Sequence, residues 1–456
     1  MKIAIVQYVD PHDLNSYPML GLGYIKSYVE HHRPGSFEFV FIQDMKGLEA
    51  HDPFDADLYA FTALSQDYSD VIRMARYVRT RTDAPVILGG SHISFLSPSL
   101  DRVFQCGALG DGETVFLEIC DALLKDRHLL PGTLAAIPGL VYWADSGEQK
   151  FSAKSAGVAQ LDELPFPDRR FGPEGLLPHL LSSRGCPFTC SFCTSSEYWK
   201  KFRAFSADYI KAEIVEVLSD FPDCDFLPFW DDLFVANRKR FRAVVNVLEA
   251  SRLTQVVAFS CGVRIDLVDR DLCELLVRGN YKAVFFGLES ASDDILRWLK
   301  GGKATVKRMQ EALDLLHEYK ITVAAPFIVG IPGETEDQLR ETYDFVIRNM
   351  EDGKLSEAQS HVMCPMPGTQ IWRYALSCNF VEESADFAWD RMRYYSGWRN
   401  YITDTRKRGD FETWVAARKS NNSLYINEVY GQDRLFEFMA PYEEKIDRMG
   451  LEFAKY

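Results

Sequence analysis

The sequence predicts an α/β protein made of two successive sheet domains and a helical C-terminal region. Three observations support this prediction. Short apolar runs alternate with helix-like spacing of apolar residues up to about residue 150. A stretch rich in proline and glycine then interrupts the pattern, and six further apolar runs follow it. Continuous apolar strands separated by helices are typical of parallel sheets that are covered on both faces.

The same observations set the expected domain boundaries. We expect a doubly wound parallel sheet, then a linker, then a partial barrel of six β/α units, then a helical cap rich in aromatic residues. These four parts are expected over residues 1–150, 151–177, 178–370 and 371–456.

Composition and charge restrict the class of protein. The chain has 456 residues, of which 47% are hydrophobic, so a globular protein is expected. It carries 51 Lys and Arg against 66 Asp and Glu, a net charge of −15, which argues against a nucleic-acid partner. We expect neither a signal peptide after Met1 nor a membrane-spanning helix, because no sufficiently long apolar run occurs. Seven of the ten cysteines are scattered, which is typical of reduced thiols in the cytoplasm.

In the first domain the expected strands have continuous apolar runs and the expected helices have apolar residues at helical spacing. The strands are Ile3–Gln7, Leu58–Leu64 and Pro85–Gly90, and the helices are Leu20–His31 and Asp70–Thr80. Two more strands, Leu140–Trp143 and Phe151–Ala153, are expected to flank a turn just before the linker.

Glycines are expected at the carboxyl edge of this first sheet, where parallel sheets bind their ligands. Gly89 and Gly90 end one strand, and Gly110 and Gly112 precede a glutamate, Glu113. Because glycine has no side chain, these positions would let a large planar ligand approach the backbone.

The second domain repeats the alternation of strands and helices at about 30 residues per β/α step. Its expected strands are His179–Ser183, Phe226–Trp230, Val256–Cys261, Ala283–Leu288, Thr322–Ile331 and Gln359–Met363. Barrels of this kind carry their chemistry at the carboxyl ends of the strands.

Three cysteines just after the first of these strands give the strongest chemical signal. Cys186, Cys190 and Cys193 have the spacing C-x3-C-x2-C, and closely spaced thiolates are the usual ligands of iron–sulfur clusters. A cluster of four irons would keep one iron open for a ligand that is not protein. The alternative is a zinc site, which would need a fourth Cys or His that we do not find nearby.

This cysteine run, with the aromatic Phe192 before its third cysteine, resembles the signature of the radical S-adenosylmethionine (SAM) superfamily. The resemblance implies a [4Fe-4S] cluster whose open iron is chelated by SAM. It also implies cleavage of SAM to a 5′-deoxyadenosyl radical and an electron donor such as flavodoxin or ferredoxin. The resemblance covers the whole second domain and implies a six-unit partial barrel.

Residues at the ends of the other strands are candidate contacts for SAM. One acid of the pair Asp231 and Asp232 would face its amino group, and Arg264 could hold its carboxylate, unless Arg264 forms a surface ion pair with Asp266. Glu289 and Ser290 end the fourth strand and either contact SAM or cap the next helix.

The fifth strand ends in a glycine-rich turn with Gly330 and Gly333, which resembles the adenine contact of the family. No general acid or base stands out, so the catalytic residues beyond the cysteines are left open. The aromatic C-terminal region either packs on the barrel or closes its open side.

The first domain resembles the cobalamin-binding domain that precedes many radical SAM modules. The matching pieces are Pro18–Leu22, Gly89–His92 and Gly110–Glu113. His92 is either an axial ligand of cobalt or a loop histidine in hydrogen bonds, and the second role is favoured.

Two functions follow from these resemblances. The favoured one is cobalamin-dependent methylation of an unactivated carbon in a small-molecule or natural-product substrate. The alternative is a cobalamin-independent radical reaction, such as dehydration, rearrangement, oxidation or epimerisation of a sugar or aminosugar. A non-catalytic iron–sulfur carrier would require a fourth protein ligand for the cluster.

Overall fold

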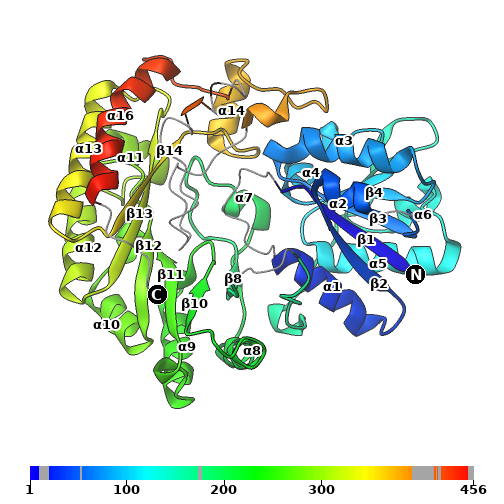
Figure 1. Ribbon diagram of the computed structural model, residues 1–456, viewed down its shortest axis with the longest axis horizontal. Helices are drawn as coiled ribbons and strands as arrows, with labels where there is room; N and C mark the ends of the chain where they lie inside the picture. Colours follow the sequence, from blue (N-terminus) through cyan, green and yellow to red (C-terminus); the bar gives the residue numbers. More distant parts are fainter. Residues whose placement is uncertain are drawn as a thin grey trace. The chain divides into compact units, whose positions relative to one another are not determined.

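Figure 1 shows the computed structural model, which describes residues 1–9, 20–51, 54–172, 177–392, 415–416, 419 and 423–449. The chain forms two compact units. The first contains Met1–Leu177, Met366–Gly368 and Trp372–Arg393, and the second contains Pro178–Pro365, Thr369–Ile371 and Tyr394–Tyr456. No helix among the described residues is long and apolar enough to cross a membrane.

A seven-stranded sheet forms the centre of the first unit, with the order β2-β1-β3-β4-β5-β6-β7. The first five strands in this order pair in parallel, whereas β6 and β7 continue the sheet in antiparallel pairing. The bounds are β1 (Lys2–Gln7), β2 (Glu38–Gln43), β3 (Leu58–Thr62), β4 (Val86–Gly89), β5 (Cys106–Ala108), β6 (Leu140–Trp143) and β7 (Gln149–Phe151).

Helices follow most of these strands: α1 (Leu20–His32), α2 (Asp44–Ala50), α3 (Tyr68–Arg79), α4 (Ser91–Phe95), α5 (Gly112–Asp126) and α6 (Pro131–Ala136). Ile3 and Ile5 of β1 share a buried cluster with Leu22 of α1 and Ile119 of α5, so these two helices cover one face of the sheet. The chain order reverses between β1 and β3, and parallel sheets bind ligands at the carboxyl ends of strands beside such a reversal.

Three features of the first unit differ from the sequence expectation. Strands β2 and β5 were not expected: β2 lies at the edge of the sheet and has only Ile42 fully buried, and β5 has only three residues, so both have weak apolar signals. Strands at Leu140–Trp143 and Phe151–Ala153 were expected beside the linker, whereas the observed strands are Leu140–Trp143 and Gln149–Phe151, and they extend the sheet itself.

Five parallel strands form the sheet of the second unit in simple sequence order, β10-β11-β12-β13-β14. Their bounds are β10 (Phe226–Phe229), β11 (Ala258–Val263), β12 (Tyr281–Phe286), β13 (Thr322–Val329) and β14 (Glu357–Val362). The helices of this unit are α7 (Ser195–Trp199), α8 (Ala207–Asp220), α9 (Arg238–Ala250), α10 (Arg270–Arg278), α11 (Asp293–Lys300), α12 (Val306–Glu318), α13 (Glu336–Glu351) and α16 (Gln432–Met449).

The expected first barrel strand, His179–Ser183, is reduced to a single parallel bridge between Leu180 and Phe229. It does not continue, because the Ser182 amide donates to the Asp231 carboxylate and the Ser182 carbonyl accepts from the Phe205 amide, so neither backbone group joins the ladder with β10. The bridge still places this segment beside β10, so the predicted architecture of an N-terminal parallel sheet followed by a partial barrel and C-terminal helices is confirmed.

The segment after the barrel returns to the first unit. Helix α14 (Gln370–Ser377) spans this passage, and Trp389 in a short 3₁₀ turn (Trp389–Met392) is fully buried among residues of the first unit. Of the aromatic residues expected to form a cap, Phe387 and Trp389 therefore pack on the α/β domain. Tyr394, Tyr395, Trp398, Tyr401 and Trp414 lie outside the described residues.

Candidate functional site

The three cysteines lie in a loop that is closed at its base by a small clasp. The clasp is an antiparallel pair of β8 (Ser183–Arg184) with β9 (Arg203–Ala204), and the loop with α7 lies between these strands. Gly185 begins the loop with φ 89°, and a β-carbon there would lie 2.8 Å from the carbonyl oxygen of Lys201. Both the backbone conformation and the close approach therefore require glycine.

Backbone bonds hold the loop in shape. The Cys190 carbonyl accepts from the Cys193 amide at 3.1 Å, and the Ser191 amide donates to the Leu299 carbonyl in α11 at 2.9 Å. The three thiols are free and partly exposed, and Phe192 beside them is half-buried. Cys186, Cys190 and Cys193 are therefore held together on one ordered loop, each of them only partly buried.

Burial raises the pKa of the Cys186 thiol above its ordinary range and that of Cys193 to about 12. A bound metal reverses this effect, because its positive charge stabilises the thiolates. Among the described residues, no three Cys, His, Asp or Glu side chains are grouped around a position for a single ion. In a cluster each cysteine binds a different iron, so its ligands stand farther apart than those of one ion.

Arg264 is the charged residue bound directly to the cysteine loop. Its Nη1 donates to the Cys190 sulfur at 3.0 Å, its Nη2 to the Lys300 carbonyl at 2.9 Å and its Nε to Asp266 at 2.6 Å. The guanidinium also lies 4.1 Å from the ring centre of Phe188. The expected partner Asp266 is present, but the pair is buried, with 7% and 4% of the two side chains exposed, so it is not a surface ion pair.

The paired acids after β10 have different roles. Asp231 is buried and accepts from the Ser182 amide at 2.9 Å and from the Ser182 hydroxyl at 2.7 Å, in addition to Ser183. Burial raises the pKa of Asp231, against the opposing effect of the Arg240 guanidinium. Asp232 is exposed and accepts from the Gly185 amide at 3.0 Å. Asp232 is therefore the acid beside the cysteine loop, which the sequence left undecided.

Glu289 forms a buried ion pair with Lys300 at 2.9 Å. Its backbone has φ 63°, a left-handed conformation that is uncommon for a residue other than glycine, and it bridges to Phe327 in β13. Lys300 also donates to the Gly287 carbonyl at 2.6 Å. The neighbouring Ser290 is fully buried, and its hydroxyl bonds to that of Thr342 in α13 at 3.1 Å. This bond connects the segment after β12 to α13.

The glycine-rich turn after β13 has Gly330 at φ 70° and Gly333 at φ 76°. A β-carbon on Gly330 would lie 2.8 Å from the Tyr425 ring, whereas one on Gly333 would meet nothing within 4 Å. Thr335 then caps α13 in a reciprocal capping box with Gln338.

Sequence reasoning missed three contributors to this region: Lys300, Glu334 and the segment that contains Tyr425. Lys300 ends an ordinary amphipathic helix, and Glu334 follows the glycines without a motif that marks it as buried. The third lies more than 90 positions along the chain from Gly330, so no local pattern could connect the two.

In the first unit the predicted glycines meet at one edge of the sheet. The Ser94 hydroxyl donates to the Gly90 carbonyl at 2.8 Å and accepts from the Gly110 amide at 3.0 Å, which ties the two glycine loops together. Gly90 has φ 97°, and a β-carbon there would lie 2.6 Å from the Ala63 carbonyl. A β-carbon on Gly110 would meet nothing within 4 Å.

Three other predicted positions surround these loops. Gly112 begins α5 against Ile25, Glu113 is buried in its first turn, and Gly89 is the last residue of β4. Leu20 and Leu22 begin α1, while Pro18 and Met19 of the same motif lie outside the described residues.

His92 is a structural histidine in this fold. Its Nδ1 lies 3.0 Å from the Ser65 hydroxyl and its Nε2 lies 2.8 Å from the Ser99 hydroxyl. The ring is fully buried between Tyr68 and Trp389, and burial lowers its pKa to about 3. Both nitrogens are therefore engaged, which supports the role in hydrogen bonds over the role of an axial ligand.

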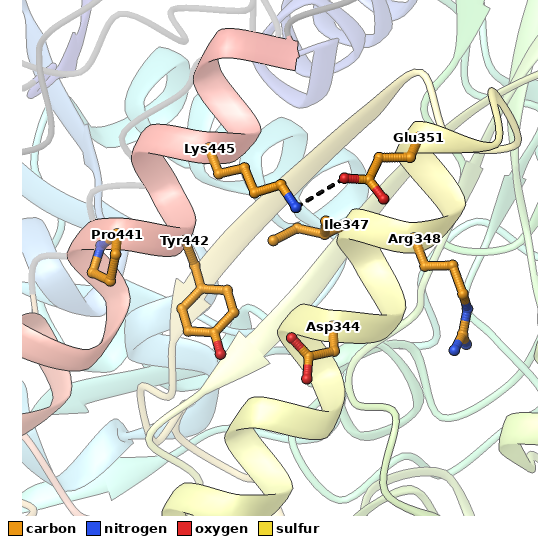
Figure 2. A pocket seen from close by; sticks show the side chains of 7 residues that line it. All are labelled: Asp344, Ile347, Arg348, Glu351, Pro441, Tyr442 and Lys445. Atoms are coloured by element: carbon orange, nitrogen blue, oxygen red, sulfur yellow. Dashed lines mark ion pairs between the residues drawn. The ribbon is translucent and has the colours of Figure 1, made fainter.

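A surface hollow of about 230 Å³ lies elsewhere in the second unit, between α13 and α16 (Figure 2). An ion pair of Lys445 with Glu351 at 2.8 Å crosses it. Its other lining residues are Asp344, Ile347, Arg348, Pro441 and Tyr442. None of these residues is a predicted site residue, so the hollow does not coincide with the cysteine loop.

Comparison with known proteins now adds to this geometry. Residues 180–346 match the model of the radical SAM superfamily. The chain is 27% identical over 385 residues to an uncharacterized methyltransferase of Pyrococcus horikoshii, covering 80% of each protein. It is 22% identical to the bacteriochlorophyllide d C-12(1)-methyltransferase of Chlorobaculum tepidum, over 82% of this chain and 76% of that protein.

Two solved structures resemble the fold. The radical SAM methyltransferase TsrM from Kitasatospora setae, with cobalamin and a [4Fe-4S] cluster bound, covers 83% of this chain and 75% of its own at a TM-score of 0.65 and 16% identity. The cobalamin-dependent SAM radical enzyme OxsB covers 98% of this chain and 71% of its own at a TM-score of 0.70 and 15% identity.

Residues 180–346 thus form a radical SAM domain, and the relatives named as methyltransferases indicate that the chain is an enzyme, with a methyltransferase favoured. The chain shares its fold, an N-terminal parallel sheet followed by the radical SAM domain, with TsrM and OxsB.

Proposed function

We propose that this enzyme methylates a carbon atom of a small-molecule substrate, with SAM, a [4Fe-4S] cluster and cobalamin as cofactors. The observation that carries the proposal is the cysteine loop. Three partly exposed thiols stand at the carboxyl end of a parallel sheet, on a loop that is fixed by a required glycine and by Arg264. When bound, the cluster would supply the electron that cleaves SAM, and cobalamin would supply the methyl group.

In this proposal Cys186, Cys190 and Cys193 hold the cluster and leave its fourth iron for the amino and carboxylate groups of SAM. Asp232 lies at the base of the loop and can accept a hydrogen bond from the amino group. Arg264 orients Cys190 through an N–H group, and each of its three nitrogens donates to a protein partner, so we assign it to the cluster and not to the SAM carboxylate.

The nucleoside of SAM would lie along the ends of β12 and β13. Glu289 can accept from the ribose hydroxyls, and its ion pair with Lys300 fixes its direction. The backbone of Gly330 and Gly333 would contact the adenine, with Phe192 on the loop opposite as an apolar neighbour. Ser290 acts behind Glu289, because its hydroxyl is bonded to Thr342.

Cobalamin would bind at the glycine edge of the first unit. The absence of side chains at Gly89, Gly90 and Gly110 suits a large ligand that approaches the backbone, and Gly112 and Glu113 begin the helix beside it. His92 would not coordinate the cobalt, because both of its nitrogens bond to serine hydroxyls. The names of the relatives support this assignment: TsrM and OxsB are both described with cobalamin.

A small-molecule substrate agrees with the relatives as well. TsrM has been solved with tryptophan as substrate, and the Chlorobaculum tepidum relative acts on a bacteriochlorophyllide. These substrates are those of the two similar proteins, and for this chain they support only the class of substrate, a small molecule.

The test is anaerobic purification from cells supplied with cobalamin, followed by absorption spectra and incubation of the reduced enzyme with methyl-labelled SAM. We expect a corrin band together with broad iron–sulfur absorption, release of 5′-deoxyadenosine, and transfer of the label to a small molecule. Iron–sulfur absorption without a corrin band would overturn the cobalamin assignment. It would favour the cobalamin-independent reaction on a sugar or aminosugar.

Replacement of the cysteines tests the cluster assignment. The variant Cys193→Ala removes one of three protein ligands, so iron content and 5′-deoxyadenosine formation should fall to background. The matched control is Cys378→Ala, an exposed cysteine, which should leave both unchanged. Full iron content in Cys193→Ala would contradict the assignment.

A further inference from the structure

A short C-terminal segment, Ser423–Tyr430, packs directly on the glycine-rich turn after β13. Its central residue is Asn427, whose side-chain amide donates to the Ile331 carbonyl at 2.6 Å and to the Glu334 carbonyl at 3.0 Å. These partners lie 96 and 93 positions earlier in the chain. The contact is therefore a long-range one that neither the turn nor helix α13 could make alone.

The other end of the Asn427 side chain orders the segment itself. Its Oδ1 accepts from the Val429 amide at 2.7 Å and from the Tyr430 amide at 3.1 Å. Asn427 is only 7% exposed, and each of its polar atoms has a partner. The Asn427 side chain thus hydrogen-bonds to its own turn and also to the backbone of the glycine-rich turn.

Tyr430 is linked to the same turn by hydrogen bonds through Glu334. The Glu334 carboxylate is fully buried, and its Oε2 accepts from the Gly330 amide at 2.8 Å and from the Tyr430 hydroxyl at 2.9 Å. The buried Glu334 carboxylate therefore stabilises the turn by a hydrogen bond from its backbone, and the Tyr430 hydroxyl orients this carboxylate. Loss of the tyrosine hydroxyl would leave a buried acceptor with one partner fewer.

Tyr425 covers the turn from a third direction. A β-carbon on Gly330 would lie only 2.8 Å from an edge carbon of the Tyr425 ring, which is half-buried. The glycine is therefore required by the positive φ of the turn and also by the ring that packs on it.

We propose that Ser423–Tyr430 is a clamp that holds the glycine turn in the shape that binds SAM. The inference rests on the proposed function, in which Gly330 and Gly333 contact the adenine. A glycine-rich turn has more backbone freedom than other turns, and binding must remove that freedom. The clamp removes it in advance, so affinity for SAM depends on Asn427 and Tyr430 although neither touches the cysteine loop. Both are positioning residues.

The test compares variants of the clamp with controls from the same segment. Asn427→Asp keeps the acceptor for Val429 and Tyr430 but loses the donor to the glycine turn, and Tyr430→Phe loses only its hydroxyl. The controls are Glu428→Ala and Val429→Ala, whose side chains are exposed between these two residues. Equilibrium dialysis gives the Kd for SAM, and 5′-deoxyadenosine formation against SAM concentration gives KM and kcat.

We expect the Kd and KM for SAM to rise about tenfold in Asn427→Asp and several-fold in Tyr430→Phe. The kcat at saturating SAM should stay within about twofold, because SAM restores the shape of the turn once it is bound. The controls should match the unmodified enzyme. A purely structural role would lower the melting temperature and leave the Kd of the folded fraction unchanged.

Failure of the clamp and failure of the proposed function give different results. If the unmodified enzyme neither binds SAM nor forms 5′-deoxyadenosine, the proposed function is wrong. If it does both, and the two clamp variants have the same Kd as the controls, the clamp is wrong and the proposed function stands. Should Asn427→Asp fail to fold, the milder Tyr430→Phe decides by the same comparison.

Discussion

Arg264 shows how the partners of a charged residue depend on segments from elsewhere in the chain. The sequence left two alternative partners for its guanidinium, the SAM carboxylate and Asp266. In the structure each nitrogen of the guanidinium donates to a protein group, to Asp266, Cys190 and the Lys300 carbonyl. Sequence gives the charge of a side chain and its approximate place, whereas its partners depend on loops that pack from elsewhere.

The Arg264 contact predicts an effect on the cluster that we propose for the three cysteines. Hydrogen bonds to ligating sulfur stabilise the reduced, more negative cluster and raise its reduction potential. In Arg264→Lys the charge near Asp266 is kept but the bond to Cys190 is lost. The potential should fall by about 40 mV for each kcal/mol of hydrogen-bond energy, measured by an anaerobic redox titration.

Arg238→Lys is the control for this titration, because Arg238 bonds to Asp269, Asp271 and the Leu267 carbonyl, none of which belongs to the cysteine loop. An unchanged potential in Arg264→Lys would show that the bond to Cys190 has no influence on the cluster.

Glu334 makes stability depend on pH. Burial raises its pKa from 4.5 in the unfolded chain to about 7, and the groups that face it, Tyr430, Tyr425 and Tyr343, are uncharged phenols in this range. The native state keeps this proton between pH 4.5 and 7 while the unfolded state loses it. The contribution of Glu334 to the free energy of unfolding is therefore largest at low pH and falls as pH rises, by about 3 kcal/mol in total.

Glu334→Gln should remove this dependence. From pH 5 to pH 8, the free energy of unfolding of the unmodified protein should fall by about 3 kcal/mol relative to that of the variant, measured by urea denaturation. Glu336→Gln provides the control, since the hydrogen bond with Arg434 lowers the pKa of the partly exposed Glu336 and the sign is opposite. A difference that does not vary with pH would contradict the buried, protonated state of Glu334.

At the scale of elements, the cysteine loop depends on its clasp. Gly185 joins β8 to the loop with φ 89° and with the Lys201 carbonyl at 2.8 Å from any β-carbon. In Gly185→Ala the clasp must open or the loop must shift. We expect destabilisation on the order of 1–3 kcal/mol and a loss of most bound iron, measured by thermal melting and iron analysis.

Gly132→Ala is the control, because Gly132 lies in a helix where a β-carbon meets nothing within 4 Å. Equal iron content in Gly185→Ala and Gly132→Ala would show that the clasp does not position the cysteines.

The strands and helices with strong periodicity could be predicted from sequence, and the weak or shared ones could not. Strands β1, β3, β4 and β10–β14 were expected because they are apolar runs. Strand β2 was missed because an edge strand buries little, and β5 because three residues are too few for a pattern. The strand at His179–Ser183 was overestimated because the Ser182 amide bonds to the Asp231 side chain and not to a neighbouring strand. Tertiary partners decided the outcomes for β2 and His179–Ser183, and neighbouring residues in the sequence do not reveal them.

At the scale of the whole molecule, the chain crosses between its two units more than once. The segment Trp372–Arg393 belongs to the first unit, although the chain up to Leu177 already contains that unit's whole sheet. Trp389 from this segment is fully buried and lies 4.7 Å from the His92 ring in an edge-on contact. A residue near the end of the chain thus completes the core of the first domain.

Trp389→Ala should therefore weaken the first unit and not the second. Removal of a buried tryptophan costs about 3–5 kcal/mol. Hydrogen exchange measured by mass spectrometry should increase in Tyr68–Arg79 and remain unchanged in β10–β14. Trp298→Ala, at a residue that is 41% exposed, is the control and should change neither region. Increased exchange in both units would contradict this division.

The return of the chain also affects how the protein is made. A ribosome releases the chain from its N-terminus, so the first sheet emerges while the tryptophan that covers His92 has not yet been synthesised. The apolar surface around Tyr68 and His92 stays open until translation has passed the entire second sheet. Exposed apolar surface of this kind favours aggregation of incomplete chains, and the core of the first domain is complete only after the barrel has been translated.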